Sequence, residues 1–447
     1  MKTKTRKENL NTLLHTHKRE RAILVGLAGV QANRWLVNDY LDELSLLADT
    51  AGAEVIFRMV QERSEIDAAY FIGKGKAEQL ARIAGEMNAD VIIFDDDLSP
   101  AQVRNLEKLC GKKVIDRSAL ILDIFARRAK TREAKTQVEL AQLRYLLPRL
   151  TRQWTHLSRQ VGGIGTRGPG ETQLEVDRRL IRKRITILVN ELKKIEKQRQ
   201  MRRKHRAGIF KAALVGYTNV GKSTLMNALT DSQVYIENRL FATLDATVRA
   251  MSIAEHEFVL LIDTVGFIRK LPHHLVASFK STLEEVHEAD LLIHVIDIAN
   301  PYFEDQMRTV QQVLDEMNVN GKQNLYVFNK IDRLENRALI DTMKEKYQPA
   351  VFVSAARGLF LEDLRRAILD IVHQHTSRFT ARVPASDGQA LAKMYELAEV
   401  TGRDIDGDTI ILEFRTTPEK LAKLKARLDS RIEFLEEPVA NASDERR

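Results

Sequence analysis

Short apolar runs alternate with longer segments of helical period in the first part of the chain. The run Asp90-Val91-Ile92-Ile93-Phe94 is an example of the former, and the segment Leu36–Leu47 of the latter. Brief apolar runs bounded by turn residues predict buried strands, and strands that alternate with helices predict a parallel sheet. We therefore predict a small parallel α/β domain over residues 21–127, which follows a basic leader at residues 1–20.

Residues 128–206 show a different pattern, in which apolar residues are spaced alternately by three and by four. This spacing is typical of helices that pack along a seam. A stretch at 162–170 interrupts it with five glycines and Pro169, which exclude a helix there. We predict an antiparallel helical hairpin with a glycine-rich tip at 162–170 and a kink at Pro148 in its first arm. The seam residues are Leu140, Leu143, Leu147, Leu150, Trp154, Leu157, Leu174, Ile181, Ile185, Leu188, Leu192 and Ile195.

The net charge of +8 is distributed unevenly along the chain. Between Arg127 and Arg206, 23 lysines and arginines outnumber seven acidic residues, so this segment carries +16 and the rest of the chain −8. Such a basic block predicts a polyanionic partner, and a slim tip containing Arg167 suits entry into folded RNA. The alternative is a solvated coiled coil whose charges only maintain solubility.

The strongest chemical signal fits the pattern G-x-x-x-x-G-K-[ST], between a predicted strand at 211–215 and a predicted helix at 224–229. Backbone amides of such a loop bind phosphate oxygens, its lysine reaches the terminal phosphates and its serine binds Mg²⁺. Lys222 and Ser223 hold these two positions. The predicted nucleotide-binding residues of the loop are Gly216, Tyr217, Thr218, Asn219, Val220, Gly221, Lys222 and Ser223.

Two further segments carry the chemistry of the terminal phosphate. Asp263-Thr264-Val265-Gly266 fits the pattern D-x-x-G, in which the carboxylate suits a metal-bound water and the Gly266 amide suits the terminal phosphate. Between the two motifs, Phe241-Ala242-Thr243-Leu244-Asp245 contains a threonine that can close on Mg²⁺. We favour Thr243 for this role, with Thr247 as the alternative. The predicted catalytic residues are Lys222, Thr243 and Gly266, and the predicted Mg²⁺ ligands are Ser223 and Thr243.

The base is determined by Asn329-Lys330-Ile331-Asp332, which fits N-K-x-D. A carboxylate accepts two hydrogen bonds from guanine, whereas adenine offers no such pair of donors. Lys330 can cover the base plane, and Ser354-Ala355-Ala356 offers an amide to the guanine carbonyl. We therefore predict a P-loop GTPase domain at 208–376 that uses GTP and Mg²⁺. 

Phe267 follows the D-x-x-G motif at a position where many signalling GTPases carry a glutamine that orients water. Because phenylalanine cannot do this, we expect slow intrinsic hydrolysis that a partner accelerates. Arg249 and Arg269 lie near the motifs in sequence, but we interpret both as exposed charges rather than as catalytic residues.

The remaining segments predict structure rather than chemistry. We interpret Gly73–Lys76 as a turn, Asp95–Asp97 as an acidic turn rather than a metal site, and Cys110 as a small buried apolar residue. After a linker through Pro384, residues 377–438 predict a small α+β module. We expect residues 439–447 to be a disordered tail. Without a secretory signal or a long apolar run, the chain is expected to be cytoplasmic, free of membrane spans and monomeric.

In these motifs the chain resembles the HflX family of GTPases over about residues 20–376. The resemblance implies a protein that binds the large ribosomal subunit and its rRNA, with the tip at 162–170 directed toward the peptidyl-transferase centre. It also implies that the GTP form splits stalled ribosomes under stress, notably heat shock. Two alternatives are a factor for large-subunit assembly and a regulatory GTPase with a protein partner. The resemblance rests on Phe71–Lys76, Leu98–Gln102, Gly162–Glu175, Gly216–Ser223 and Asp263–Ile268.

Overall fold

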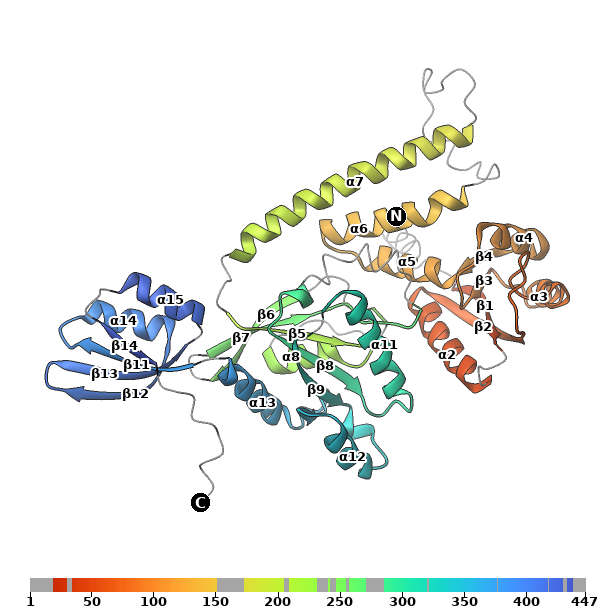
Figure 1. Ribbon diagram of the computed structural model, residues 1–447. Helices are drawn as coiled ribbons and strands as arrows, with labels where there is room; N and C mark the ends of the chain where they lie inside the picture. Colours follow the sequence, from red (N-terminus) through yellow and green to blue (C-terminus); the bar gives the residue numbers. More distant parts are fainter. Residues whose placement is uncertain are drawn as a thin grey trace, which may run out of the picture. The chain divides into compact units, whose positions relative to one another are not determined.

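The chain forms three separate sheets with associated helices (Figure 1). The computed structural model describes residues 19–29, 34–150, 173–204, 209–230, 240–241, 247–254, 257–270, 285–319, 321–375, 377–416, 418–428 and 432–436. These residues fall into two compact units, one containing the N-terminal sheet and the other the two remaining sheets. The predicted α/β class, with an N-terminal parallel domain, a central sheet domain and a C-terminal module, is confirmed.

The N-terminal sheet is entirely parallel and has the strand order β2-β1-β3-β4. Helices α3 and α4 cover one of its faces, where Ile23, Ile92 and Phe94 enter a common core with Leu80 and Leu106. The prediction missed α5, which follows β4 directly and is started by the Asp116 side chain. The elements are β1 (Glu20–Ala28), α2 (Arg34–Thr50), β2 (Ala53–Glu62), α3 (Lys74–Glu86), β3 (Val91–Phe94), α4 (Pro100–Cys110), β4 (Lys113–Asp116) and α5 (Arg117–Arg128).

Three local features of this domain concern a helix start, a helix cap and a buried thiol. Gly73 is the residue before α3, so Gly73–Lys76 begins a helix instead of forming a turn. Ser99 and Gln102 form a reciprocal cap at the start of α4. Cys110 is buried, and burial raises the pKa of its thiol to about 11.

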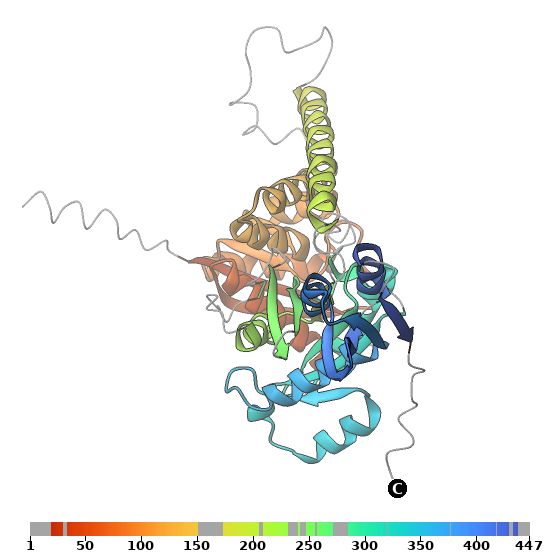
Figure 2. The same ribbon diagram turned by 90° about the vertical axis from the view of Figure 1, so that its left-hand side faces the viewer.

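Two helices, α6 (Arg132–Leu146) and α7 (Gln173–Lys204), form the predicted antiparallel pair, seen side by side in Figures 1 and 2. Arg184 on α7 lies 2.6 Å from Glu139 on α6 in an ion pair. Leu188 and Leu140 are buried, as the seam predicts. The predicted kink at Pro148 is wrong, because α6 ends there in a single 3₁₀ turn, η1 (Leu147–Arg149). A proline removes the amide that would continue the helix. The tip at 162–170 lies outside the described residues.

The central sheet has the strand order β10-β9-β8-β5-β7-β6, in which β6 is antiparallel to β7 and the other pairs are parallel. This arrangement brings the carboxyl ends of β5, β7 and β9 to one edge. The sequence reasoning missed β6, because its apolar residues do not alternate regularly. The strands are β5 (Lys211–Gly216), β6 (Thr247–Ala254), β7 (Glu257–Asp263), β8 (Leu291–Asp297), β9 (Gln323–Asn329) and β10 (Ala350–Phe352).

Helices of this domain bury one apolar stripe each against the sheet. Phe303 and Met307 of α11 pack with Phe328 and Met343, whereas Leu364 and Ile368 of α13 are fully buried. The described helices are α8 (Lys222–Thr230), α11 (Phe303–Glu316), η3 (Ile331–Arg333), α12 (Ala338–Lys346) and α13 (Leu361–Gln374).

The C-terminal module is an antiparallel sheet of order β12-β13-β11-β14 with two helices. Here the prediction of a linker through Pro384 is wrong, since β11 (Ser377–Pro384) is a central strand. The strand β12 (Glu399–Asp406) lies at one edge of this sheet. The other elements are α14 (Gly388–Leu397), β13 (Thr409–Thr416), α15 (Pro418–Arg427) and β14 (Glu433–Glu436).

Candidate functional site

The phosphate loop joins β5 to α8, and two of its glycines are required by its backbone. Gly216 has φ +153°, and a Cβ there would lie 2.3 Å from the carbonyl oxygen of Val295. Gly221 has φ +98°, and its Cβ would lie 2.4 Å from Nδ2 of Asn329. Because a side chain fits at neither position, the glycine spacing of the motif follows from the packing of the loop on β8 and β9.

Lys222 is buried beneath this loop. Its Nζ donates hydrogen bonds to the carbonyl oxygens of Gly216 (3.0 Å) and Tyr217 (2.7 Å). Burial lowers the pKa of Lys222 to about 8, although Asp263 opposes the shift. A phosphate group placed here would supply negative charge to a buried ammonium. Burial, assisted by the charge of Lys222, also lowers the pKa of nearby His294 to about 4, so this imidazole is neutral at pH 7.

The oxygens beside Lys222 fit a divalent cation bound to nucleotide phosphates. Ser223 Oγ donates to Asp263 Oδ2 at 2.7 Å, which brings the end of β7 to the start of α8. Thr218 Oγ1 is buried and has no hydrogen-bond partner among the described residues. Mg²⁺ is bound in such sites by one or two protein oxygens together with phosphates and water. Among the described residues there is no cluster of three acidic, histidine or cysteine side chains that would bind a metal alone.

The structure does not describe Thr243, the threonine that the sequence favours as a Mg²⁺ ligand. Thr243, with the rest of Ala242–Asp245, lies outside the described residues. The alternative, Thr247, begins β6 and stands directly opposite Asp263 in the antiparallel pair. Thr243 therefore stays a prediction.

Asn329 connects three of the predicted motifs through its side chain. Its Nδ2 donates to the carbonyl oxygen of Val220 at 2.8 Å, and its Oδ1 accepts from the amide of Ala355 at 3.0 Å. The residue is buried at the end of β9. A single amide side chain thus fixes the phosphate loop and the Ser354–Ala356 segment relative to the N-K-x-D motif.

The other two motif residues after β9 are each held by side-chain contacts within the protein. Lys330, with φ +64°, donates to the carbonyl oxygen of Asn219 at 2.8 Å and forms an ion pair with Asp297 at 2.7 Å. Ser354 Oγ donates to Asp332 Oδ1 at 2.6 Å, and this bond is the main cause that lowers the pKa of Asp332. The carboxylate is therefore charged and already oriented. Asp297 was missed by the sequence reasoning, although its position at the end of an apolar run was a usable signal.

Phe267 makes structural contacts instead of presenting a polar group. Its side chain is 2% exposed. Its amide donates to the carbonyl oxygen of Gly216 at 3.1 Å, and its carbonyl accepts from the Thr218 amide at 2.7 Å. Of the two arginines considered, Arg249 lies in β6 opposite Leu261. The Arg269 amide donates to the Tyr217 hydroxyl at 2.9 Å.

Phe241 of the predicted switch segment, and Lys270 after the D-x-x-G motif, both belong to the N-terminal unit. The ring of Phe241 meets that of Phe125 edge to face, with centroids 4.7 Å apart. Lys270 Nζ lies 2.6 Å from Asp95 Oδ2 and 2.5 Å from Asp96 Oδ1. The Asp95–Asp97 turn is thus an acidic turn that holds a lysine, in agreement with the sequence interpretation.

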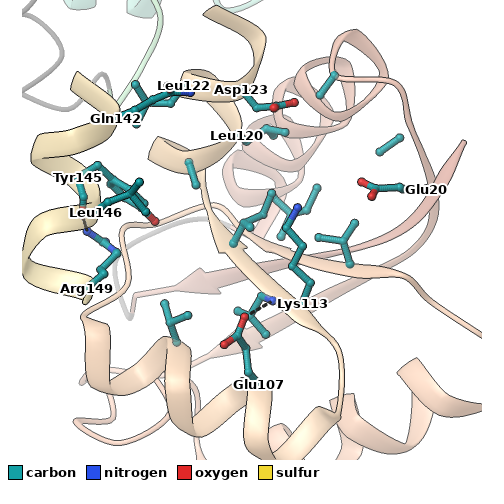
Figure 3. Close-up of a pocket in the computed structure, with 18 of the residues that line it drawn as sticks. Glu20, Glu107, Lys113, Leu120, Leu122, Asp123, Gln142, Tyr145, Leu146 and Arg149 are labelled. Carbon is teal, nitrogen blue, oxygen red and sulfur yellow. Dashed lines mark hydrogen bonds between the residues drawn. The ribbon is translucent and has the colours of Figure 1, made fainter. Parts of the chain in front are cut away.

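A cavity of about 710 Å³ lies in the N-terminal domain, and its lining residues are different from those of the nucleotide motifs (Figure 3). It is lined by α4, α5, α6 and the edge strand β4. The guanidinium of Arg149 stacks 3.6 Å from the ring centroid of Tyr145, whose hydroxyl donates to Asp116 at 2.8 Å. None of its lining residues belongs to a nucleotide motif, so the phosphate loop, not this cavity, is the candidate nucleotide site.

Comparison with known proteins agrees with the geometry of the loop. Three family models match the chain: "GTP-binding GTPase N-terminal" at residues 38–126, "GTP-binding GTPase Middle Region" at 128–206 and "50S ribosome-binding GTPase" at 211–330. GTPase HflX of Escherichia coli K12 is 47% identical over 363 residues, which cover 80% of this chain and 85% of that protein. The chain belongs to the HflX family of GTPases.

Other members are similar over the same span. GTPase HflX of Flavobacterium psychrophilum is 46% identical over 382 residues, covering 80% of this chain and 92% of that protein. A solved structure of a GTP-binding protein from Sulfolobus solfataricus in complex with GDP is 27% identical, covers 79% of this chain and 99% of its own, and has a TM-score of 0.43. As an HflX-family member, the chain is a ribosome-binding GTPase whose P-loop domain supports GTP hydrolysis. No helix within the described part of the chain is long and apolar enough to cross a bilayer.

Proposed function

We propose that this GTPase engages the large ribosomal subunit and its rRNA through the basic hairpin, and splits or rescues stalled ribosomes while GTP is bound. The observation that carries the proposal is the set of cations that α7 leaves exposed. Val176 and Leu188 of this helix are buried, whereas several of its lysines and arginines are exposed. Positive charge on an exposed helix face suits the phosphates of RNA. The exposed cations are Arg179, Arg182, Lys183, Lys193, Lys194 and Lys197.

In this proposal the chain's own groups bind and orient the nucleotide. Amides of the loop and of the first turn of α8 hold the phosphates. Lys222 neutralises the terminal phosphates, and Asp332 accepts hydrogen bonds from guanine. Ser223 and Thr243 would hold Mg²⁺, which supplies positive charge to the transferring phosphoryl group when bound. These roles are supported by the hydrogen-bonded positions of buried Lys222 and of half-buried Ser223 and Asp332.

Slow intrinsic hydrolysis that the ribosome stimulates is part of the proposal. The buried ring of Phe267 has no group that can position water. We expect purified ribosomal large subunits to raise the GTP hydrolysis rate of the full-length protein. A monomer in the cytoplasm fits this role. Equal rates with and without ribosomes would contradict the proposal.

The second candidate function is large-subunit assembly, which the same basic hairpin would serve. Light scattering separates the two, because splitting intact ribosomes lowers the scattered intensity and binding to immature subunits does not. We expect a fall in scattering with a non-hydrolysable GTP analogue and none with GDP. Unchanged scattering, together with binding to immature subunits, would favour assembly.

Two variants separate nucleotide chemistry from the action of the tip. Lys222→Ala should abolish nucleotide-dependent action on ribosomes. Shortening residues 162–170 should spare nucleotide binding but abolish splitting. A protein with the shortened tip that still splits ribosomes at the normal rate would show that the tip is not the acting element.

A further inference from the structure

Three hydrogen bonds connect the phosphate loop to the segment after the D-x-x-G motif. Two join backbone groups, from the Thr218 amide to the Phe267 carbonyl and from the Phe267 amide to the Gly216 carbonyl. The third uses a side chain, since the amide of Arg269 donates to the hydroxyl of Tyr217 at 2.9 Å. All these residues lie within one compact unit.

Tyr217 is not required by the phosphate-loop pattern, which leaves its position open to any residue. It is nevertheless 4% exposed, and it forms a parallel bridge with Phe267 that extends the pairing of β5 with β7. A phenol oxygen can accept a hydrogen bond that a phenylalanine at the same place cannot. Substitution of Tyr217 by phenylalanine would therefore remove this one hydrogen bond between the phosphate loop and the segment after the D-x-x-G motif, and would keep the ring.

These bonds hold Gly266 against the buried lysine. A Cβ on Gly266 would lie 3.0 Å from Lys222 Nζ and 2.8 Å from the Cα of Thr218. The terminal phosphate of GTP must contact this same Nζ. In this conformation the Gly266 backbone stands beside Nζ, where the terminal phosphate has to lie, and movement of the segment from Gly266 to Arg269 away from the loop would make room for it. GDP lacks this group and makes no such demand.

We propose that Tyr217 sets the preference between GTP and GDP, by holding Gly266–Arg269 in the position that closes the terminal-phosphate site. A bond present in the closed form and absent from the open one lowers the apparent affinity for GTP without changing that for GDP. Tyr217 is thus a positioning residue that acts through the backbone of Arg269. This role adds a determinant of nucleotide state to the GTPase activity of the family.

The test is Tyr217→Phe in the full-length protein, which removes one oxygen and keeps the ring. Equilibrium titrations with fluorescent GDP and with a fluorescent non-hydrolysable GTP analogue measure both dissociation constants. One hydrogen bond between uncharged groups corresponds to about a five-fold effect. We expect the dissociation constant for the analogue to fall about five-fold and that for GDP to change less than about two-fold.

Two matched variants identify the source of the effect. Arg269→Ala keeps the backbone amide that donates the bond and should leave the ratio of the two constants unchanged. Tyr395→Phe removes a hydroxyl from an exposed tyrosine in the C-terminal module and should also have no effect. Equal changes for GDP and the analogue, or an unchanged ratio in Tyr217→Phe, would overturn the proposal.

Hydrogen exchange can be measured on the wild-type protein, so its result cannot be affected by misfolding of a variant. The Arg269 amide should be protected with GDP and should exchange at least about ten-fold faster with the GTP analogue, because its acceptor is lost. Equal protection in the two nucleotide states would mean that the bond does not respond to the terminal phosphate.

Discussion

Ser354→Ala should weaken guanine nucleotide binding although Ser354 has no predicted contact with the base through its side chain. Its hydroxyl donates to Asp332 at 2.6 Å, and Ser354 itself is fully buried. The hydroxyl therefore fixes the carboxylate in one orientation before the nucleotide arrives. Without it, the carboxylate side chain has to be ordered during binding.

The expected magnitude follows from the cost of ordering that side chain. Immobilising one side chain at a binding site costs about 0.5–1.5 kcal/mol, which corresponds to about a two- to twelve-fold loss of affinity. GTP and GDP should lose affinity equally, because they share the base. Titration with fluorescent GDP and GTP analogues measures the effect. Ser64→Ala, which changes an exposed serine in the N-terminal domain, is the matched control.

The pH dependence gives a second, independent measurement on the same variant. The Ser354 hydroxyl lowers the pKa of Asp332 below its ordinary value of 3.8. Nucleotide binding that depends on the charged carboxylate therefore persists above this lowered pKa and is lost as the pH falls through it. In Ser354→Ala the pKa of Asp332 should rise, and the loss of GDP affinity should begin at a higher pH. An unchanged pH profile, or an effect on GTP alone, would refute the role assigned to Ser354.

Three further predictions concern the loop, the metal and the hairpin. Gly221→Ala should abolish nucleotide binding and lower the melting temperature, because its Cβ would lie 2.4 Å from Asn329; normal binding would show that the loop can adjust. Removal of Mg²⁺ with EDTA, like Ser223→Ala, should slow hydrolysis and weaken GTP binding more than GDP binding, as measured by phosphate release and titration. Leu188→Ala should lower the free energy of unfolding by about 2–5 kcal/mol in urea, whereas Leu180→Ala, at a position 42% exposed, should change it by less than about 0.5 kcal/mol.

The nucleotide motifs could be located from sequence because their residues are dictated by short-range geometry. Gly216 and Gly221 are fixed by contacts that exclude a Cβ. Asn329 is the last residue of the strand β9 and Asp332 follows three residues later, at the edge where the carboxyl ends of parallel strands meet. The sequence could not show which residues outside the motifs hold the motif side chains in place. The partner of Lys330 is Asp297, which is 33 residues away and carries no motif of its own.

In the C-terminal module, β11 was misread as a linker for a physical reason. In β11, buried Phe379, Ala381 and Val383 alternate with Arg378 and other polar residues. This is the period of a strand with one covered face, but the small alanine and the final proline weakened the pattern. The strand is stabilised by pairing with β13 and β14, both of which follow later in the chain. Such long-range pairing overrides a weak local signal.

Phe267 connects the selection of GTP with the need for outside assistance in hydrolysis. Its ring is buried, and both its amide and its carbonyl are bonded to the phosphate loop. In the proposed opening, Gly266 moves to admit the terminal phosphate, and GTP binding then also breaks these two backbone bonds. The freed groups belong to a residue with no polar side chain, so opening the site admits GTP without assembling a group that can orient water. A GTPase with this arrangement can keep GTP bound without hydrolysing it until a partner orders the segment from Gly266 to Arg269.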